Sequence, residues 1–177
     1  MMHTPTRLLA LLAIVLLAAP ASFAQAEKEA AYVPAGLDDP LNLSTPEETV
    51  RSMFRAMYLG DATLVDKVFL PDAQLRRVTN TGEIRPDGLQ AWRDWVGAQS
   101  PGDAVEEIFE IEVQATGRLA SVWAPFVVTY KGAVVGCGVN EFVLAKAEGD
   151  WRIVFAMDNA APEGTDCTTF KTDYTKD

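Results

Sequence analysis

The chain has 177 residues, of which 49% are hydrophobic and 23% charged, and this composition is typical of a single globular domain. Asp and Glu outnumber Lys and Arg by 25 to 15, so the net charge is −10. The basic residues Arg76-Arg77 and Lys171 to Lys176 are too few to form a patch, and we expect them to be solvated. Because nucleic acids bind clustered basic side chains, the composition excludes nucleic acid as a main partner.

The first 24 residues show the three parts of a secretory signal peptide. Arg7 precedes an apolar run over residues 8–19, and small residues follow the helix-breaking Pro20. This run is shorter than the roughly 20 residues of a membrane anchor, so we expect cleavage after Ala24, with cleavage after Ala26 as the close alternative. The sequence therefore predicts a periplasmic or secreted protein without a membrane partner after cleavage.

Cleavage at this position would also remove His3, the only histidine of the chain. A mature chain without histidine has no Ser-His-Asp or Cys-His relay, and a zinc site would need cysteine or carboxylate ligands alone. The sequence thus disfavours most hydrolases and metalloenzymes, and we predict neither a metal site nor a cofactor.

Residues 25–44 show no helical or strand period and are predicted to be a linker. A helix is expected to follow, because Thr45 can cap it and Pro46 suits its first turn. Its apolar stripe is formed by residues at helical spacing: Val50, Met53, Phe54, Met57 and Tyr58. The side chains between them are expected to face water: Arg51, Ser52 and Arg55.

Two shorter helices and a small hairpin are expected next. Asp61 caps the second helix, which Pro71 stops, and Asp87 caps the third. Between these helices, residues 73–79 and 83–85 have strand character on either side of a tight turn and are predicted to pair.

The second half of the chain predicts β structure. Four long strand candidates are separated by hairpin turn signals: 104–115, 119–130, 133–146 and 151–158. Helices followed by a long antiparallel meander indicate an α+β fold, in which a curved antiparallel sheet carries three N-terminal helices on its concave face. We place this domain at 45–162 and a C-terminal tail at 163–177.

Three motifs resemble a known superfamily: Val122-Trp123-Ala124-Pro125-Phe126, the run Gly136 to Leu144, and Asp150-Trp151-Arg152-Ile153 followed by Met157-Asp158. Together with the order of elements from Thr45 to about Pro162, they resemble the nuclear transport factor 2-like superfamily, and within it a bacterial subgroup labelled lumazine-binding or SnoaL-like. The resemblance implies a cone-shaped fold with a hydrophobic pocket between sheet and helices. The superfamily includes isomerases, dehydratases, cyclases, hydrolases and proteins without catalysis, so the fold alone does not decide the function.

Hairpin pairing predicts which residues share a face of the sheet. A two-residue loop at 131–132 would place Trp123 opposite Asn140, and a three-residue loop at 148–150 would place Asn140 opposite Asp158. A two-residue loop at the second position would instead turn Asp158 to the other face, and the apolar pattern argues for that register. Both alternatives stay open, and the first gives a polar and aromatic row across three strands.

Asp158 is the candidate catalytic residue. In an apolar pocket, desolvation would raise the pKa of its carboxyl group, which could then act as a general base or acid, while Asn140 donates to a developing oxyanion. We favour the alternative in which Asp158 accepts backbone hydrogen bonds at the strand end. The predicted ligand-binding set comprises Tyr58, Trp123, Asn140 and Asp158, with Tyr58 on the helix that covers the pocket.

We predict that the exported protein binds a small, partly apolar molecule. A second hypothesis is a lyase or isomerase with Asp158 as general base, although no full catalytic set of the resembling enzymes aligns with this chain. A third is a homodimer formed through the outer sheet face, whose alternation is unusually apolar for a monomer.

Cys137 and Cys167 are the only cysteines, and an even number in an oxidising compartment predicts a disulfide. Hairpin pairing places Cys137 opposite about residue 161, and the turn at 162–164 can bring the chain back. The tail shows no strand or helix pattern, so the disulfide is expected to hold it in place. The alternative is two free thiols, with Cys137 buried in the core.

Overall fold

The computed structural model describes residues 31–175. The predicted signal peptide and the first part of the predicted linker lie outside the described residues. Within the described range, no helix is long and apolar enough to cross a membrane.

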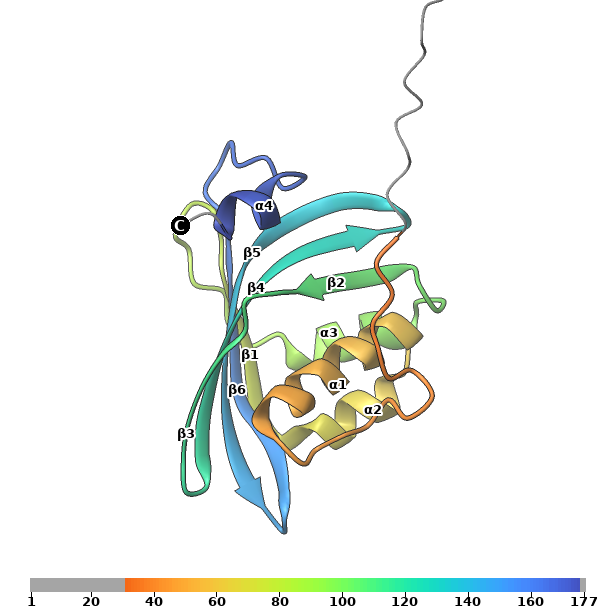
Figure 1. The fold of residues 1–177 in the computed structure, drawn as a ribbon, viewed down its shortest axis with the longest axis vertical. Helices are drawn as coiled ribbons and strands as arrows, with labels where there is room; N and C mark the ends of the chain where they lie inside the picture. Colours follow the sequence, from red (N-terminus) through yellow and green to blue (C-terminus); the bar gives the residue numbers. More distant parts are fainter. Residues whose placement is uncertain (1–30, 176–177) are drawn as a thin grey trace, which may run out of the picture. The chain divides into compact units, whose positions relative to one another are not determined.

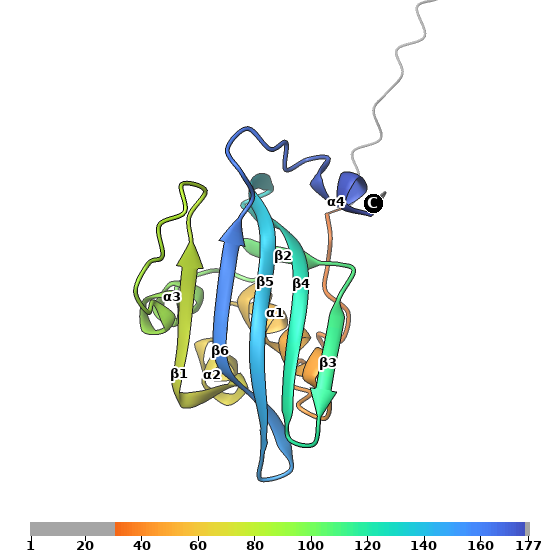
Figure 2. The ribbon, with the colours of Figure 1, turned by 90° about the vertical axis from the view of Figure 1, so that its left-hand side faces the viewer.

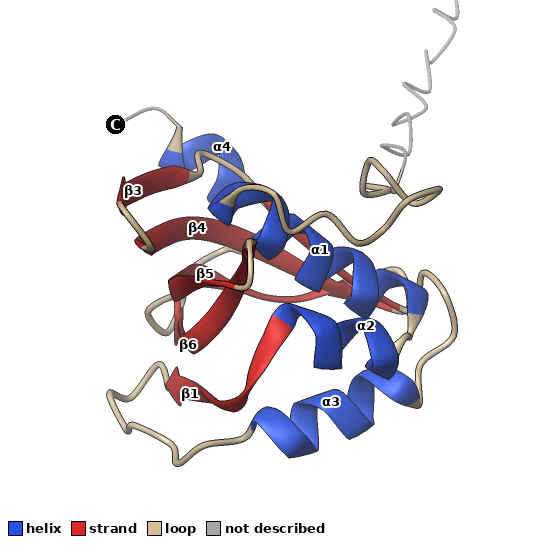
Figure 3. Ribbon diagram, turned by 90° about the horizontal axis from the view of Figure 1, so that it is seen from below, coloured by secondary structure: helices blue, strands red, loops and turns tan. Residues whose placement is uncertain are grey.

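Helices come first in the described chain, and most of the sheet follows. The helices are α1 (Pro46–Leu59), α2 (Ala62–Val68), α3 (Leu89–Gly97) and α4 (Phe170–Tyr174). The strands are β1 (Phe69–Val78), β2 (Ala104–Ile108), β3 (Glu112–Thr116), β4 (Leu119–Tyr130), β5 (Ala133–Ala147) and β6 (Asp150–Ala160). Helices α1, α2 and α3 lie on one side of the curved sheet (Figures 1 and 3). The predicted α+β class is confirmed.

The strands form a single sheet in the order β1-β6-β5-β4-β2, with β3 also paired to β4. Neighbours are antiparallel except for β1 and β6, which run parallel, so the prediction of a fully antiparallel sheet is corrected at this edge. The physical reason is that β1 follows α2 directly and pairs with the last strand of the chain. Figure 2 shows β1 beside β6 at the edge of the sheet.

Two predicted strand segments differ from the observed ones. The hairpin expected between residues 73–79, which lie mostly in β1, and residues 83–85 is reduced to a single bridge between Val78 and Ile84. The strand expected over 104–115 is divided into β2 and β3, because Glu110 adopts a positive φ of 42° between them. This break lets β2 leave the line of β3 and pack on α1 (Figure 1).

The ends of α1 follow the sequence signals. The Thr45 hydroxyl accepts a hydrogen bond from the backbone N–H of Glu48, and Pro46 occupies the first turn. Gly60 ends the helix with a φ of +67°, and a Cβ atom at this position would lie 2.2 Å from the carbonyl oxygen of Gln99. Both the left-handed backbone and the close approach therefore require glycine.

The apolar stripe of α1 packs against the concave face of the sheet. Phe54 meets Phe142 of β5 edge to face, with ring centroids 6.1 Å apart. The largest fully buried side chains come from both layers: Val50, Met57, Val122, Phe142, Leu144 and Ile153. Because a fully buried side chain of this size stabilises the fold by about 1.5 to 3 kcal/mol, this interface is the main source of stability.

The prediction that Ser52 and Arg55 face water is wrong. Residues 31–44, which we call the N-terminal arm, lie along this face of α1. The Ser52 hydroxyl hydrogen-bonds the backbone of Asn42, and Arg55 Nε donates to the Ala35 carbonyl at 2.7 Å. Both side chains are consequently buried.

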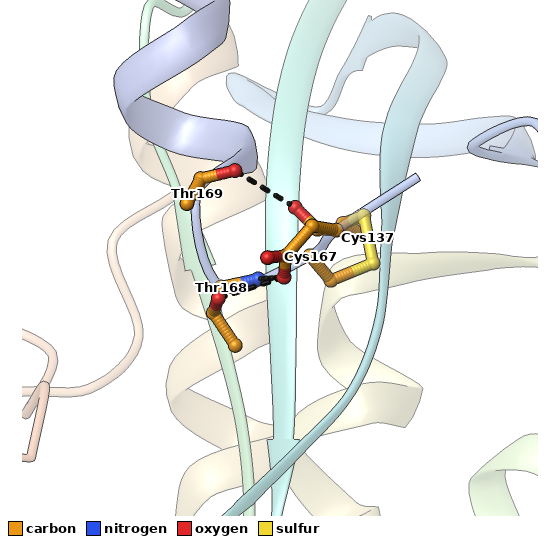
Figure 4. The surroundings of a disulfide bond; sticks show 5 residues. Cys137, Cys167, Thr168 and Thr169 are labelled. Carbon is orange, nitrogen blue, oxygen red and sulfur yellow. Dashed lines mark hydrogen bonds between the residues drawn. A yellow bond between two sulfur atoms is a disulfide. The ribbon is translucent and has the colours of Figure 1, made fainter. Parts of the chain in front are cut away.

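The predicted disulfide joins Cys137 of β5 to Cys167, with Cα atoms 5.4 Å apart (Figure 4). This distance suits a disulfide. The backbone N–H of Ala161 donates to the Cys137 carbonyl, as the hairpin pairing predicted. The chain then turns back and the bridge fixes it to the sheet just before α4.

The tail contains the short helix α4, which the sequence pattern did not predict. The Trp123 indole donates to the Tyr174 hydroxyl at 3.2 Å, and the Tyr174 ring packs edge to face on Phe109. Lys171 forms an ion pair with Glu107, which corrects the expectation that it is merely solvated. These contacts and the disulfide hold α4 against β4.

Candidate functional site

The hairpin between β4 and β5 separates two of the predicted site residues. Its loop at 131–132 has the expected two residues, but a bulge next to Val128 shifts the pairing by one position. Trp123 consequently lies opposite Glu141, and the predicted pairing of Trp123 with Asn140 is wrong. Since neighbouring side chains of a strand alternate, Trp123 points to the outer face, where it is 42% exposed.

The hairpin between β5 and β6 combines both alternatives that the sequence left open. Its loop has two residues, but a bulge between Val143 and Leu144 restores the register of a three-residue loop. Asn140 therefore lies directly opposite Asp158, and both side chains are buried on the inner face. The bulge explains why an apolar and a polar pattern could coexist in one strand.

Asp158 is bound by an arginine that we expected to be solvated. Arg77 lies opposite Asp158 across the parallel β1–β6 pair, and its Nε donates to Oδ1 at 2.7 Å while Nη2 donates to Oδ2. The Arg77 side chain is 57% exposed and that of Asp158 only 12%, so the pair lies where the interior meets solvent. Hydrogen bonding to Asp158 raises the pKa of the Arg77 guanidinium.

Asn140 contacts a carboxyl group that the sequence analysis did not single out. Its Nδ2 donates to Oε1 of Glu106 on β2 at 2.7 Å. Burial is the main cause that raises the pKa of Glu106 to about 7, and the negative charge of Asp158 raises it further, against the opposing effects of Asn140 and Arg77. The signal for this residue was the alternation of β2, where Glu106 shares a face with the buried Ala104 and Ile108.

We call Arg77, Asp158, Asn140 and Glu106 the polar row. These residues come from β1, β6, β5 and β2, and together they present guanidinium donors, an amide and a carboxyl group that is about half protonated near neutral pH. Phe142 lies two residues from Asn140 on the same face and supplies an apolar neighbour. The arrangement suits a planar molecule that has both hydrogen-bond donors and acceptors.

Tyr58 does not contact the polar row. Tyr58 is near the end of α1, and its ring lies against Gly102. Its backbone carbonyl accepts a hydrogen bond from the N–H of that glycine at 2.8 Å. Trp123 is on the outer face, hydrogen-bonded to α4. The structure therefore brings together Asn140 and Asp158 from the predicted ligand-binding set.

Two hollows in the surface lie away from the polar row. One, of about 460 Å³, is an open groove at the β3–β4 hairpin around Leu119 and Val143. The other, of about 160 Å³, lies between the N-terminal arm, α1 and β2. Neither is lined by a member of the polar row, which reaches solvent through Arg77.

The helices, the curved sheet and its strand order define the nuclear transport factor 2-like fold. A nuclear transport factor 2-like protein of unknown function from Shewanella baltica is 18% identical, with a TM-score of 0.51 over 66% of this chain and 91% of that chain. One with a cystatin-like fold from Novosphingobium aromaticivorans is 15% identical, with a TM-score of 0.52 over 67% and 80%. The association domain of C. elegans CaMKII is 12% identical, with a TM-score of 0.53 over 63% and 90%.

The chain belongs to the family described as "Putative lumazine-binding", whose model matches residues 43–157. The comparison with curated proteins found no match. The structural similarities are at low identity and therefore concern the fold alone.

The raised pKa of Glu106 leads to a prediction about stability. Its carboxyl group binds a proton up to about pH 7 in the folded protein but only up to about pH 4.5 when unfolded. The folded state thus holds the extra proton between these values, and this contribution is complete below pH 4.5 and lost as the pH rises through 7. Relative to the non-ionising variant Glu106→Gln, the wild type should lose about 2 to 3 kcal/mol between pH 5 and pH 8.

Urea unfolding of both proteins at the two pH values measures this difference. The matched control is Glu112→Gln, which removes an exposed carboxylate from β3 and should follow the wild type. Parallel pH profiles for the wild type and Glu106→Gln would show that the Glu106 pKa is not raised.

Proposed function

We propose that the polar row binds a small planar heterocycle of the lumazine type. The observation that carries this proposal is the convergence of four polar side chains from four strands at the solvent end of an otherwise apolar face. Lumazine is a fused-ring dione whose edge alternates ring N–H groups and carbonyls. The family description points to the same class of molecule.

Each member of the row has hydrogen-bonding capacity that a ligand can use. Arg77 directs Nε and Nη2 to Asp158, and its Nη1 makes no hydrogen bond to any other described residue. Asn140 uses Nδ2 for Glu106, while its Oδ1 has no donor among residues 31–175. A ligand carbonyl would therefore accept from Arg77, and a ligand N–H would donate to Asn140 Oδ1 or to Glu106.

Export of the protein forms part of the proposal. The signal-peptide pattern of residues 1–24 supports it, and so does the disulfide, because disulfides persist in oxidising compartments. We place the site in the periplasm or the secreted fraction.

Binding has more support than catalysis by Asp158. A general base needs a free lone pair near the substrate, and three hydrogen bonds from Arg77 already occupy most of the roughly four acceptor sites of the Asp158 carboxylate. A lyase or isomerase with Asp158 as base would have to use the one remaining acceptor site or weaken this ion pair.

Homodimerisation through the outer face is a second candidate function. Leu119 and Trp123 are exposed there, and Phe155 and Met157 of β6 are only partly buried. Apolar side chains that gather on one face are typical of an interface. Sedimentation at micromolar concentration would show a dimer if this face is used.

The proposed ligand site is tested by titrating the purified protein into lumazine and following the lumazine fluorescence. Asn140→Ala removes the hydrogen bond to Glu106 and the proposed hydrogen bond from the ligand to Oδ1. This variant should bind lumazine about 10-fold or more weakly, as expected for a lost buried hydrogen bond. The matched control is Asn159→Ala. Asn159 follows Asp158 on β6, but its side chain is exposed. Equal affinities of the two variants, or no binding by the wild type at millimolar lumazine, would contradict the proposal.

A further inference from the structure

We infer that the 160 Å³ cavity beneath the N-terminal arm is a second ligand site, which takes a small aromatic carboxylate. The cavity lies between three segments that are distant in sequence: the arm, α1 and β2. It shares no residue with the polar row, so this inference is independent of the proposed function.

The walls of the cavity are apolar and partly aromatic. Tyr32 comes from the arm, Phe54 from α1 and Ile108 from β2. Phe54 and Ile108 are buried, and burial raises the pKa of the Tyr32 hydroxyl, which therefore stays a neutral donor at physiological pH. A volume of 160 Å³ is below the range of drug-sized pockets and suits a single substituted ring.

Two guanidinium groups line the cavity, and no carboxylate does. Arg55 is buried, with Nε bound to the Ala35 carbonyl and Nη2 to Glu48. Arg51 directs Nε and Nη2 to Glu47, and its Nη1 makes no hydrogen bond to another described residue. Arg51 thus lines the cavity with a guanidinium group that has an unused donor, Nη1, which a carboxylate could accept from.

The neighbouring charges do not reverse this preference. Around Tyr32, the remaining charged groups are Glu107 and Lys171, which form an ion pair with each other. Glu47 and Glu48 are each paired with one of the two arginines and do not line the cavity. A ligand anion would therefore meet cationic groups in its immediate contact shell.

The arm gives the cavity its outer wall. Arg55 fixes the arm through the Ala35 carbonyl, and Asn42 is held by Ser52 further along α1. Residues 32–35, which end at the first attachment, line the void together with Phe54. An aromatic carboxylate would fill this void with its ring and place its charge at Arg51.

The probe for this site is 4-fluorobenzoate, observed by fluorine NMR in the presence of the purified protein. The wild type should broaden the signal, and Arg51→Gln should bind about 10-fold more weakly, as expected for the loss of a charge-assisted hydrogen bond. Arg51 is partly exposed and its ion pair with Glu47 is an i,i+4 surface pair, so the variant should fold normally. The uncharged 4-fluorobenzamide should bind more weakly than the carboxylate.

Two further variants distinguish this site from other sites. Arg118→Gln removes an exposed positive charge elsewhere and should bind like the wild type. Ala35→Phe would place a ring in the cavity from the arm and should abolish binding. The inference is overturned if Ala35→Phe binds the probe as tightly as the wild type, or if Arg118→Gln loses as much affinity as Arg51→Gln. It is also overturned if the wild type does not broaden the signal at a probe concentration of about 10 mM, since such weak binding is worth less than about 3 kcal/mol.

Discussion

Replacing Gly60 by alanine is expected to lower the free energy of unfolding by about 3 kcal/mol or more. The left-handed backbone alone costs an L-residue about 1 to 2 kcal/mol. The added methyl group would also lie 2.2 Å from the Gln99 carbonyl oxygen, which belongs to the backbone and cannot rotate away. The loop after α3 would have to move, and overpacking of this kind is costly.

Urea unfolding measures this effect, and Gly82→Ala is the matched control. Gly82 also has a positive φ, of +83°, but no atom lies within 4 Å of the position of its Cβ. The control should therefore lose only the conformational part, about 1 kcal/mol. Equal losses in both variants would show that the contact with Gln99 contributes nothing.

Removal of the disulfide should have an effect of similar size. The bridge closes a loop between residues 30 positions apart, which corresponds to about 3 to 4 kcal/mol in the chain-entropy model. The double variant Cys137→Ser, Cys167→Ser should lose this stability and release α4, so that Trp123 loses its contact with Tyr174. Urea unfolding and tryptophan fluorescence follow the two effects.

Reduced wild-type protein serves as the control, because it should behave like the double variant. Intact mass under denaturing, non-reducing conditions first establishes the bond in protein from the exported fraction. Two alkylatable thiols in that sample would contradict the disulfide, and unchanged stability after reduction would contradict its role.

Local signals predicted α1 and several strand limits well, but they missed α4 and placed the end of α2 at Pro71, which lies inside β1. Thr45 and Gly60 bound α1, and β4 covers residues 119–130 as expected. A bulge, in contrast, adds one residue to one strand and leaves the alternation on either side intact. The sequence therefore offered two registers for Asp158, and the structure contains parts of both.

Long-range pairing determined the rest of the candidate site. Arg77 meets Asp158 only because β1 pairs in parallel with β6. Glu106 meets Asn140 only because the break at Glu110 lets β2 leave the line of β3. Neither event has a signal within a few residues of the side chain concerned. The same reason explains Arg55, which is covered by an arm 20 positions earlier in the chain.

The carboxyl group whose pKa is raised also differs between the sequence prediction and the structure. A carboxyl group of raised pKa was one of two alternatives for Asp158, and the structure instead has one at the half-buried Glu106, where burial is the main cause. Asp158 instead has a guanidinium partner. The carboxyl group with the raised pKa thus lies on β2, for which the sequence predicted a strand but no site residue.

Lumazine binding at the polar row is tested most directly by NMR of isotope-labelled protein. Lumazine should shift the side-chain amide signals of Asn140 and the Nε–H signal of Arg77, whose hydrogen bonds lie in the polar row. The indole N–H of Trp123, on the outer face, should not move. If saturating lumazine leaves the Asn140 and Arg77 signals unchanged, or shifts the Trp123 signal in their place, lumazine does not bind at the polar row.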